Sequence, residues 1–143
     1  MNKKLLGLVA TCVLIVFNSS CNPMNDRASY VNSTLLRQVD SASNHILELS
    51  EFIKVNGVER QEGSLKYELK FKARISAKKD CYWDGNISYS PLDQSRIAIG
   101  MVTLGTDSLK SNFVKSNYGY EFEGTAVFEK TDKGWTLLSI YFI

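Results

Sequence analysis

Two aspartates and two aromatic residues stand together in the middle of the chain. Asp80 and Asp84 flank Tyr82 and Trp83, and sites that act on sugars often combine carboxylates with aromatic platforms. Spacing within a turn does not give the distance between the two acids, so hydrolysis stays an open alternative. The simpler interpretation is that each aspartate caps a turn beside aromatic residues of the core, and we favour it.

The same region also suggests a binding patch. Tyr82, Trp83 and Tyr89 fall in an irregular part of the sequence, and irregular segments carry binding residues more often than strands do. The alternative is that these rings fill the open end of a sheet. We expect that alternative, and retain Tyr82, Trp83 and Tyr89 as candidate binding residues.

Glu51 is the fourth candidate binding residue, because it interrupts an apolar alternation that runs from Leu47 to Val55. A half-buried glutamate inside a cone-shaped sheet would give a binding cavity its polar group. A β-bulge near Ser50–Phe52 would instead turn Glu51 towards solvent. The pattern favours the bulge.

Arrangements typical of catalysis or cofactor binding are missing from the sequence. His45 is the only histidine and there is no Cys-x-x-Cys pair, so the usual metal-ligand sets cannot be assembled. No Gly-x-Ser-x-Gly motif supplies a nucleophile, and Gly100–Gly105 lacks the lysine of a phosphate-binding loop. We expect His45 to be structural, the protein not to be an enzyme, and no metal or cofactor to be bound.

The charge balance argues against nucleic acid as a partner. The net charge of +2 comes from Lys3 and Lys4, and without them the basic residues equal the 15 acidic ones. A protein that binds nucleic acid needs a surplus of basic residues to neutralise phosphates. We therefore expect no nucleic-acid binding.

The N-terminus has the pattern of an export signal. Lys3 and Lys4 precede an apolar run from Leu5 to Phe17, which at 1.5 Å per residue is too short to cross the roughly 30 Å of a bilayer core. Small residues then lead to Cys21. The pattern predicts a signal peptide over residues 1–20.

This segment resembles a bacterial lipoprotein signal, with Asn18 where that family usually has leucine. The resemblance implies that Cys21 carries the lipid and anchors the protein to a membrane of the bacterial cell envelope. Asn22 is not the aspartate that retains lipoproteins at the inner membrane, which favours the outer membrane. A lipidated Cys21 would leave Cys81 without a partner, whereas an unlipidated one could form a disulfide with Cys81.

The remainder of the sequence predicts one domain over residues 30–143, after a flexible tether at 21–29. Apolar residues at helical spacing predict a short helix over 30–40. Alternating patterns predict strands at 47–55, 65–77 and 118–129, with turns at Asn56-Gly57 and at 131–134. Residues 135–143 are apolar on both parities, which predicts a strand that is buried on both faces or closes the sheet. The strand at 65–77 would span roughly 40 Å and should therefore bend. The predicted fold is α+β, with a short N-terminal helix packed on a curved antiparallel sheet of four to five strands.

Two blocks are similar to segments of uncharacterised small bacterial lipoproteins with a cystatin-like (nuclear transport factor-like) α+β domain. They are Phe52–Gly57 together with Tyr67–Ala73, and the hairpin Phe128–Trp135. The resemblance implies one helix followed by a curved antiparallel sheet, and it transfers no functional residues.

Together these observations predict a membrane-tethered envelope protein that binds a protein or a small molecule without catalysis. One alternative is an inhibitor or immunity-type protein, which would use a loop such as residues 80–90 to block an envelope enzyme. The second alternative is a hydrolase of unknown substrate.

Overall fold

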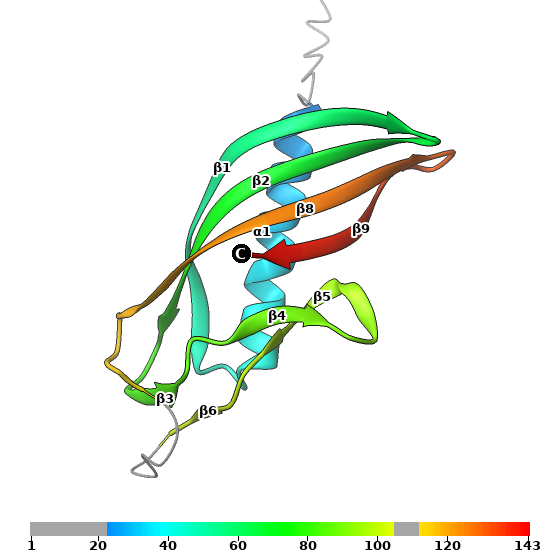
Figure 1. Cartoon of the computed structure of the whole chain (residues 1–143). Helices are drawn as coiled ribbons and strands as arrows, with labels where there is room; N and C mark the ends of the chain where they lie inside the picture. Colours follow the sequence, from blue (N-terminus) through cyan, green and yellow to red (C-terminus); the bar gives the residue numbers. More distant parts are fainter. Residues whose placement is uncertain (1–22, 105–111) are drawn as a thin grey trace, which may run out of the picture.

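One helix lies against the inner face of a curved antiparallel sheet (Figure 1). The structure is a computed structural model that describes residues 23–104 and 112–143. Helix α1 spans Pro23–Ala42. The main sheet has the strand order β1 (Leu47–Glu62), β2 (Ser64–Ala77), β8 (Gly119–Thr131) and β9 (Gly134–Phe142). The predicted α+β fold is confirmed.

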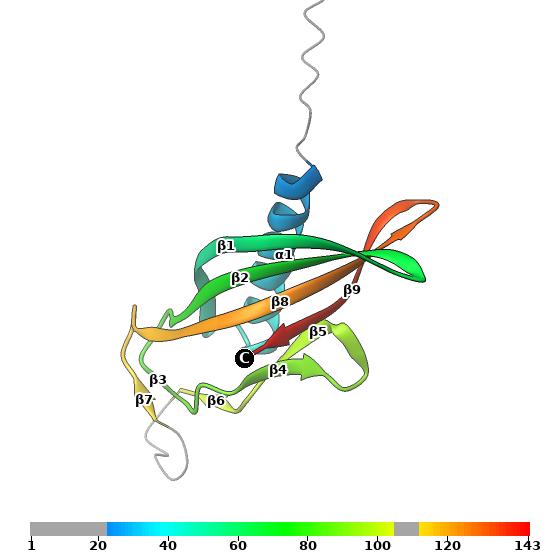
Figure 2. The same ribbon diagram turned by 45° about the horizontal axis from the view of Figure 1, so that its top comes forward.

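Two smaller sheets complete the domain. Strand β3 (Cys81–Trp83) pairs with β6 (Val102–Thr103) and with β7 (Phe113–Val114). Strands β4 (Ile87–Ser90) and β5 (Asp93–Ile99) form a hairpin that lies next to β9 and α1 (Figures 1 and 2). Among the described residues, no helix is long and apolar enough to cross a membrane.

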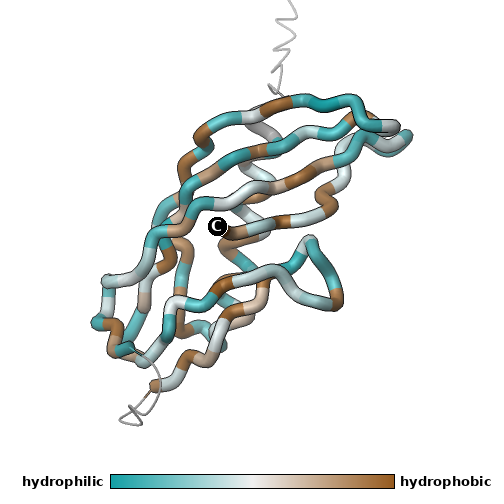
Figure 3. The backbone as a smooth tube through the Cα atoms, viewed as in Figure 1, coloured by the Kyte–Doolittle hydropathy of each residue, from teal (hydrophilic) through white to brown (hydrophobic). Residues whose placement is uncertain are grey.

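The predicted alternation in β2 determines the core. From Tyr67 to Ile75 every second residue is buried, and the residues between them are exposed or half-buried. Hydrophilic and hydrophobic residues accordingly alternate along the long strands (Figure 3). Helix α1 contributes a stripe of buried apolar residues spaced four positions apart, which places them on one face of the helix. The buried residues are Tyr67, Leu69, Phe71, Ala73, Ile75 and Ala77 of β2 and Val31, Leu35 and Val39 of α1.

The predicted boundary between tether and helix is wrong. The helix begins at Pro23 rather than near residue 30, so most of the segment interpreted as a tether is helical. Proline is well tolerated in the first helical turn because its missing N–H would have no partner there. Within this segment Arg27 is buried and Ala28 packs on the core, which a reading of composition alone did not reveal. Cys21 and the signal segment lie outside the described residues.

The predicted bulge is confirmed, and the predicted Asn56-Gly57 turn is wrong. The pairing of β1 with β2 shifts register between Leu49 and Glu51. Strand β1 then continues through Gly57 to Glu62, and the chain turns at Gly63, whose φ is 74°. Gly57 has another role, because a Cβ atom there would lie 1.8 Å from the Tyr67 hydroxyl.

Candidate functional site

A groove between α1, β5 and β9 brings polar and aromatic side chains together from three elements. Its volume is about 440 Å³. We call it the helix–hairpin groove. Its lining residues are Tyr30, Thr34, Arg37 and Gln38 of α1, Asp93, Ser95 and Arg96 of β5, and Trp135, Thr136 and Leu137 of β9.

The helical side of the groove follows from residue spacing. Positions 30, 34, 37 and 38 are separated by intervals of three and four, or are adjacent, so they lie along one strip of α1. This strip borders the buried stripe of Val31, Leu35 and Val39. The core therefore fixes the strip in position, facing β5 and β9.

Gln38 holds the two walls of the groove at a set separation. Its Nε2 donates to the carbonyl oxygen of Ser95 (3.2 Å), and its Oε1 accepts from the backbone N–H of Ile97 (2.8 Å). The amide thus bonds to β5 as a neighbouring strand would. Because both bonds come from one planar group, they restrict both the distance and the orientation of the hairpin relative to α1.

Three charged side chains line the groove. The Arg96 Nε lies 3.5 Å from Asp93 Oδ2. Bonds from the hydroxyl and the amide of Ser95, with a smaller contribution from Arg96, hold the pKa of Asp93 below its usual range. Arg37 is exposed and makes no ion pair within the described part of the chain. The lining therefore carries an excess of one positive charge.

Thr34 contributes a hydroxyl that has no partner among the described residues. The residue is 5% exposed, and its Oγ1 makes no hydrogen bond to any of the described residues. A buried hydroxyl left without a partner costs about 1–3 kcal/mol. A polar group bound in the groove could recover that free energy, which distinguishes Thr34 from a hydroxyl that is already paired.

Trp135 belongs both to the groove and to a buried stack centred on Arg27. The Arg27 guanidinium carbon lies 3.9 Å from the centre of the Tyr67 ring and 4.4 Å from that of Trp135. Arg27 Nη2 lies 4.0 Å from Glu59 Oε1. The stack fixes the orientation of Trp135 and places a buried positive charge beside it. Sequence reasoning missed Arg27, because nothing in its neighbourhood shows an apolar pattern.

The structure separates the predicted aromatic candidates. Trp83 is 0% exposed, and its ring centre lies 5.3 Å from that of Tyr120 and 6.0 Å from that of Phe122. The patch interpretation is therefore wrong for Trp83, which fills the core because its large apolar ring gains most from burial.

The two tyrosines lie in different sheets and pack on different rings. Tyr82 is half-buried in β3 and packs on Phe113 at 5.5 Å. Tyr89 is exposed in β4 and packs on Tyr141 at 5.7 Å. Of the three aromatic candidates, Tyr89 is therefore the one with an exposed side chain.

The acidic candidates bond to the backbone. Asp80 Oδ1 accepts from the backbone N–H of Ser116, and Asp84 Oδ1 accepts from that of Asn86, each at 2.8 Å. The Asp84 bond closes a turn, as the simpler interpretation expects, whereas the Asp80 bond joins residues 36 positions apart, so Asp80 does not cap a turn of its own segment. Glu51 is exposed on the outer face of the sheet, where it lines a cleft of about 310 Å³. It therefore does not supply a polar group to the inner side of the sheet.

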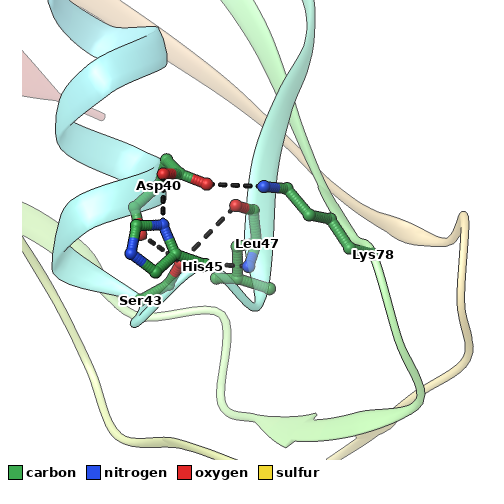
Figure 4. A network of polar contacts seen from close by, with 5 residues as sticks. All are labelled: Asp40, Ser43, His45, Leu47 and Lys78. Carbon is green, nitrogen blue, oxygen red and sulfur yellow. Dashed lines mark hydrogen bonds and ion pairs between the residues drawn. The ribbon is translucent and has the colours of Figure 1, made fainter.

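His45 takes part in a network at the end of α1 (Figure 4). Its Nδ1 lies 2.5 Å from Asp40 Oδ2, and Lys78 Nζ donates to Asp40 Oδ1 at the same distance. Nearby, the Ser43 hydroxyl accepts from the Leu47 N–H at 3.0 Å. The network connects the helix end to β1 and to the residue after β2, as expected for a structural histidine.

This network predicts how stability depends on pH. Bonds from Lys78 and His45 hold the pKa of Asp40 below its usual range. The stabilising contribution should be complete above the unfolded-state pKa and lost as the pH falls through the lower folded-state value. We expect Asp40→Asn to be destabilising at pH 7 and the difference from the natural chain to shrink below about pH 4. Urea unfolding of both proteins from pH 7 to pH 2.5 measures this difference, and a pH-independent difference would contradict the assignment.

Metal ligands do not gather in this part of the molecule. Residues 23–104 and 112–143 contain no group of three or more His, Cys, Asp or Glu side chains placed to hold an ion. Cys81 is buried, and this burial, together with the charge of Asp80, raises the pKa of its thiol.

Comparison of the chain with protein-family models, with characterised proteins and with solved structures gave no match.

Proposed function

We propose that this chain is a non-enzymatic binding domain of the bacterial cell envelope, held at the outer membrane by a lipid on Cys21, and that it binds its ligand in the helix–hairpin groove. The ligand would be a small molecule or an extended segment of an envelope protein. The observation that carries this proposal is the buried hydroxyl of Thr34, which has no partner in residues 23–104 and 112–143 and lines a groove whose walls are fixed by Gln38.

The chemistry of the lining favours binding over turnover. Proton transfer needs a group whose pKa lies near the working pH, whereas arginine stays protonated and Asp93 has a lowered pKa. The hydroxyl of Ser95 donates to Asp93 at 2.6 Å, but a carboxylate whose pKa is lowered is too weak a base to activate it as a nucleophile. Arginine, hydroxyl and aromatic groups can instead orient and hold a ligand.

Photo-crosslinking in intact cells tests this proposal. A photoreactive residue would replace Thr136, which is exposed and lines the groove. A second variant would carry it at Glu121, which lines the outer-face cleft. After irradiation, the protein is purified from membranes and its intact mass is measured. We expect acyl mass on a chain beginning at Cys21 in both variants, and a ligand adduct only from position 136.

The same measurement separates the alternatives. Adducts from position 121 alone, or no adduct from 136, would contradict the groove as the binding site. A chain that begins at Cys21 but has no acyl mass would contradict the proposed lipid anchor. The adduct from position 136 would then still test the proposed binding site. A third variant would carry the photoreactive residue in place of Tyr89, which is exposed in the region of residues 80–90 that an inhibitor or immunity-type protein would use. A protein adduct from position 89 but not from position 136 would favour that function.

A further inference from the structure

We infer that the helix–hairpin groove recognises an oxyanion, either a carboxylate or a phosphate, of a ligand that packs its remaining part against Trp135. This inference rests on the proposed function of the groove and specifies the chemistry of its ligand. In this arrangement Arg37 and Arg96 bind the anion from α1 and β5, and the Thr34 hydroxyl donates a hydrogen bond to it.

The charge distribution is the first argument. Arg37 has no carboxylate within ion-pair distance in the described part of the chain, and Asp93 is already bonded by Ser95 and Arg96. Further positive charge surrounds Trp135, since Lys130 Nζ lies 5.5 Å and the Arg27 guanidinium 4.4 Å from its ring centre. An anion entering the groove therefore meets attraction from several sides.

The donor set is the second argument. A guanidinium presents several N–H donors in a planar fork that matches the two oxygens of a carboxylate or a phosphate. The Thr34 hydroxyl can donate one further bond. A metal cation would find only Asp93 as a charged ligand in the lining, and two arginines would repel it. The lining thus discriminates between the two signs of charge.

The shape of the groove limits the ligand. A volume of about 440 Å³ lies within the range of about 300–1,000 Å³ typical of small-molecule sites. Trp135, Tyr30 and Leu137 supply apolar surface on the same groove. The matching ligand is therefore a small acid with an apolar or ring-shaped part, or the phosphate headgroup of a lipid in the anchoring membrane.

NMR spectroscopy of isotope-labelled protein with Cys21 replaced by alanine tests the inference. The probes are benzoate, inorganic pyrophosphate and neutral glucose, and vesicles of phosphatidylglycerol compared with vesicles of phosphatidylcholine. We expect saturable shifts of the Nε–H signals of Arg37 and Arg96 with benzoate or pyrophosphate, and a dissociation constant of about 1 mM or tighter. A response to phosphatidylglycerol vesicles without a response to the free anions would identify a lipid headgroup as the source of the oxyanion.

Matched variants separate binding from folding. Arg37→Gln should weaken binding of the anion at least about tenfold, whereas Arg74→Gln should leave it unchanged, because Arg74 lines the outer-face cleft. Thr34→Val should weaken binding several-fold while the thermal midpoint of the free protein stays the same or rises, since the hydroxyl has no partner to lose. A purely structural Thr34 would instead lower the midpoint.

Two negative results have different meanings. Groove shifts with glucose but none with anions would overturn the oxyanion inference and leave the groove as a binding site. Equal weakening by Arg37→Gln and Arg74→Gln would show general charge attraction and would also overturn the inference. Failure of every probe together with no adduct from position 136 would remove both proposals.

Discussion

Replacing Trp83 with alanine is expected to lower the free energy of unfolding by about 3–5 kcal/mol. The side chain is fully buried and lies between Tyr120 and Phe122, so truncation removes apolar contacts and leaves a cavity at the end of the sheet. The rings around the cavity are held by strand pairing of β8 with β2. The site therefore cannot collapse fully, which places the loss in the upper part of the range for core residues. Urea unfolding at pH 7 measures it.

Tyr82→Ala is the matched control, since Tyr82 is the adjacent residue of β3 and also carries an aromatic ring. It is half-buried and packs on one ring, that of Phe113. We expect Tyr82→Ala to cost about 1 kcal/mol. Similar losses from both variants would show that Trp83 is not the residue that holds this end of the core. Neither variant should change the signals of groove residues.

The parts of the fold that depend on a regular local pattern could be predicted from the sequence. The alternation over residues 65–77 predicted β2 because one face of a strand is buried and the other meets solvent. The phase change around Glu51 predicted the bulge for the same reason. Both signals are carried by neighbouring residues, and the structure confirms both.

The predictions that were wrong concern segments whose structure depends on contacts between residues far apart in the sequence. Asn56-Gly57 has the composition of a turn, but both residues pair with β2, so β1 continues through them, and Gly57 leaves room for the Tyr67 hydroxyl. The first turns of α1 lack an apolar pattern, and Arg27 is nevertheless buried by stacking on Tyr67 and Trp135. The pattern within one segment does not show that Gly57 will meet Tyr67, or that Arg27 will stack on Tyr67 and Trp135.

The groove could not be predicted for a related reason. Helical spacing identified the buried stripe of α1 but not what covers the neighbouring strip that carries Thr34 and Arg37. That strip is completed by Ser95 and Trp135, which lie far away in the sequence. The register between α1 and β5 is set by the side chain of Gln38, for which the sequence shows no distinguishing signal.

Gly124→Ala is expected to destabilise the protein by about 1–3 kcal/mol. The direction is opposite to the usual one, because glycine inside a strand is normally less favourable than alanine. Gly124 is paired directly with Phe71, and a Cβ atom at position 124 would lie 2.4 Å from the tip of the Phe71 ring. The ring cannot move aside freely, since Phe52 stacks on it at 5.2 Å and Phe142 packs against it at 6.0 Å.

A double-mutant cycle tests whether this contact causes the loss. Phe71→Leu shortens the side chain and frees the space above position 124, at the cost of aromatic packing in the core. If the clash is the cause, Gly124→Ala should cost at least about 1 kcal/mol less in the Phe71→Leu background than in the natural chain. Equal costs in the two backgrounds would contradict this explanation. The coupling would show that β8 carries glycine at this position so that the buried Phe71 ring can pack against Phe52 and Phe142.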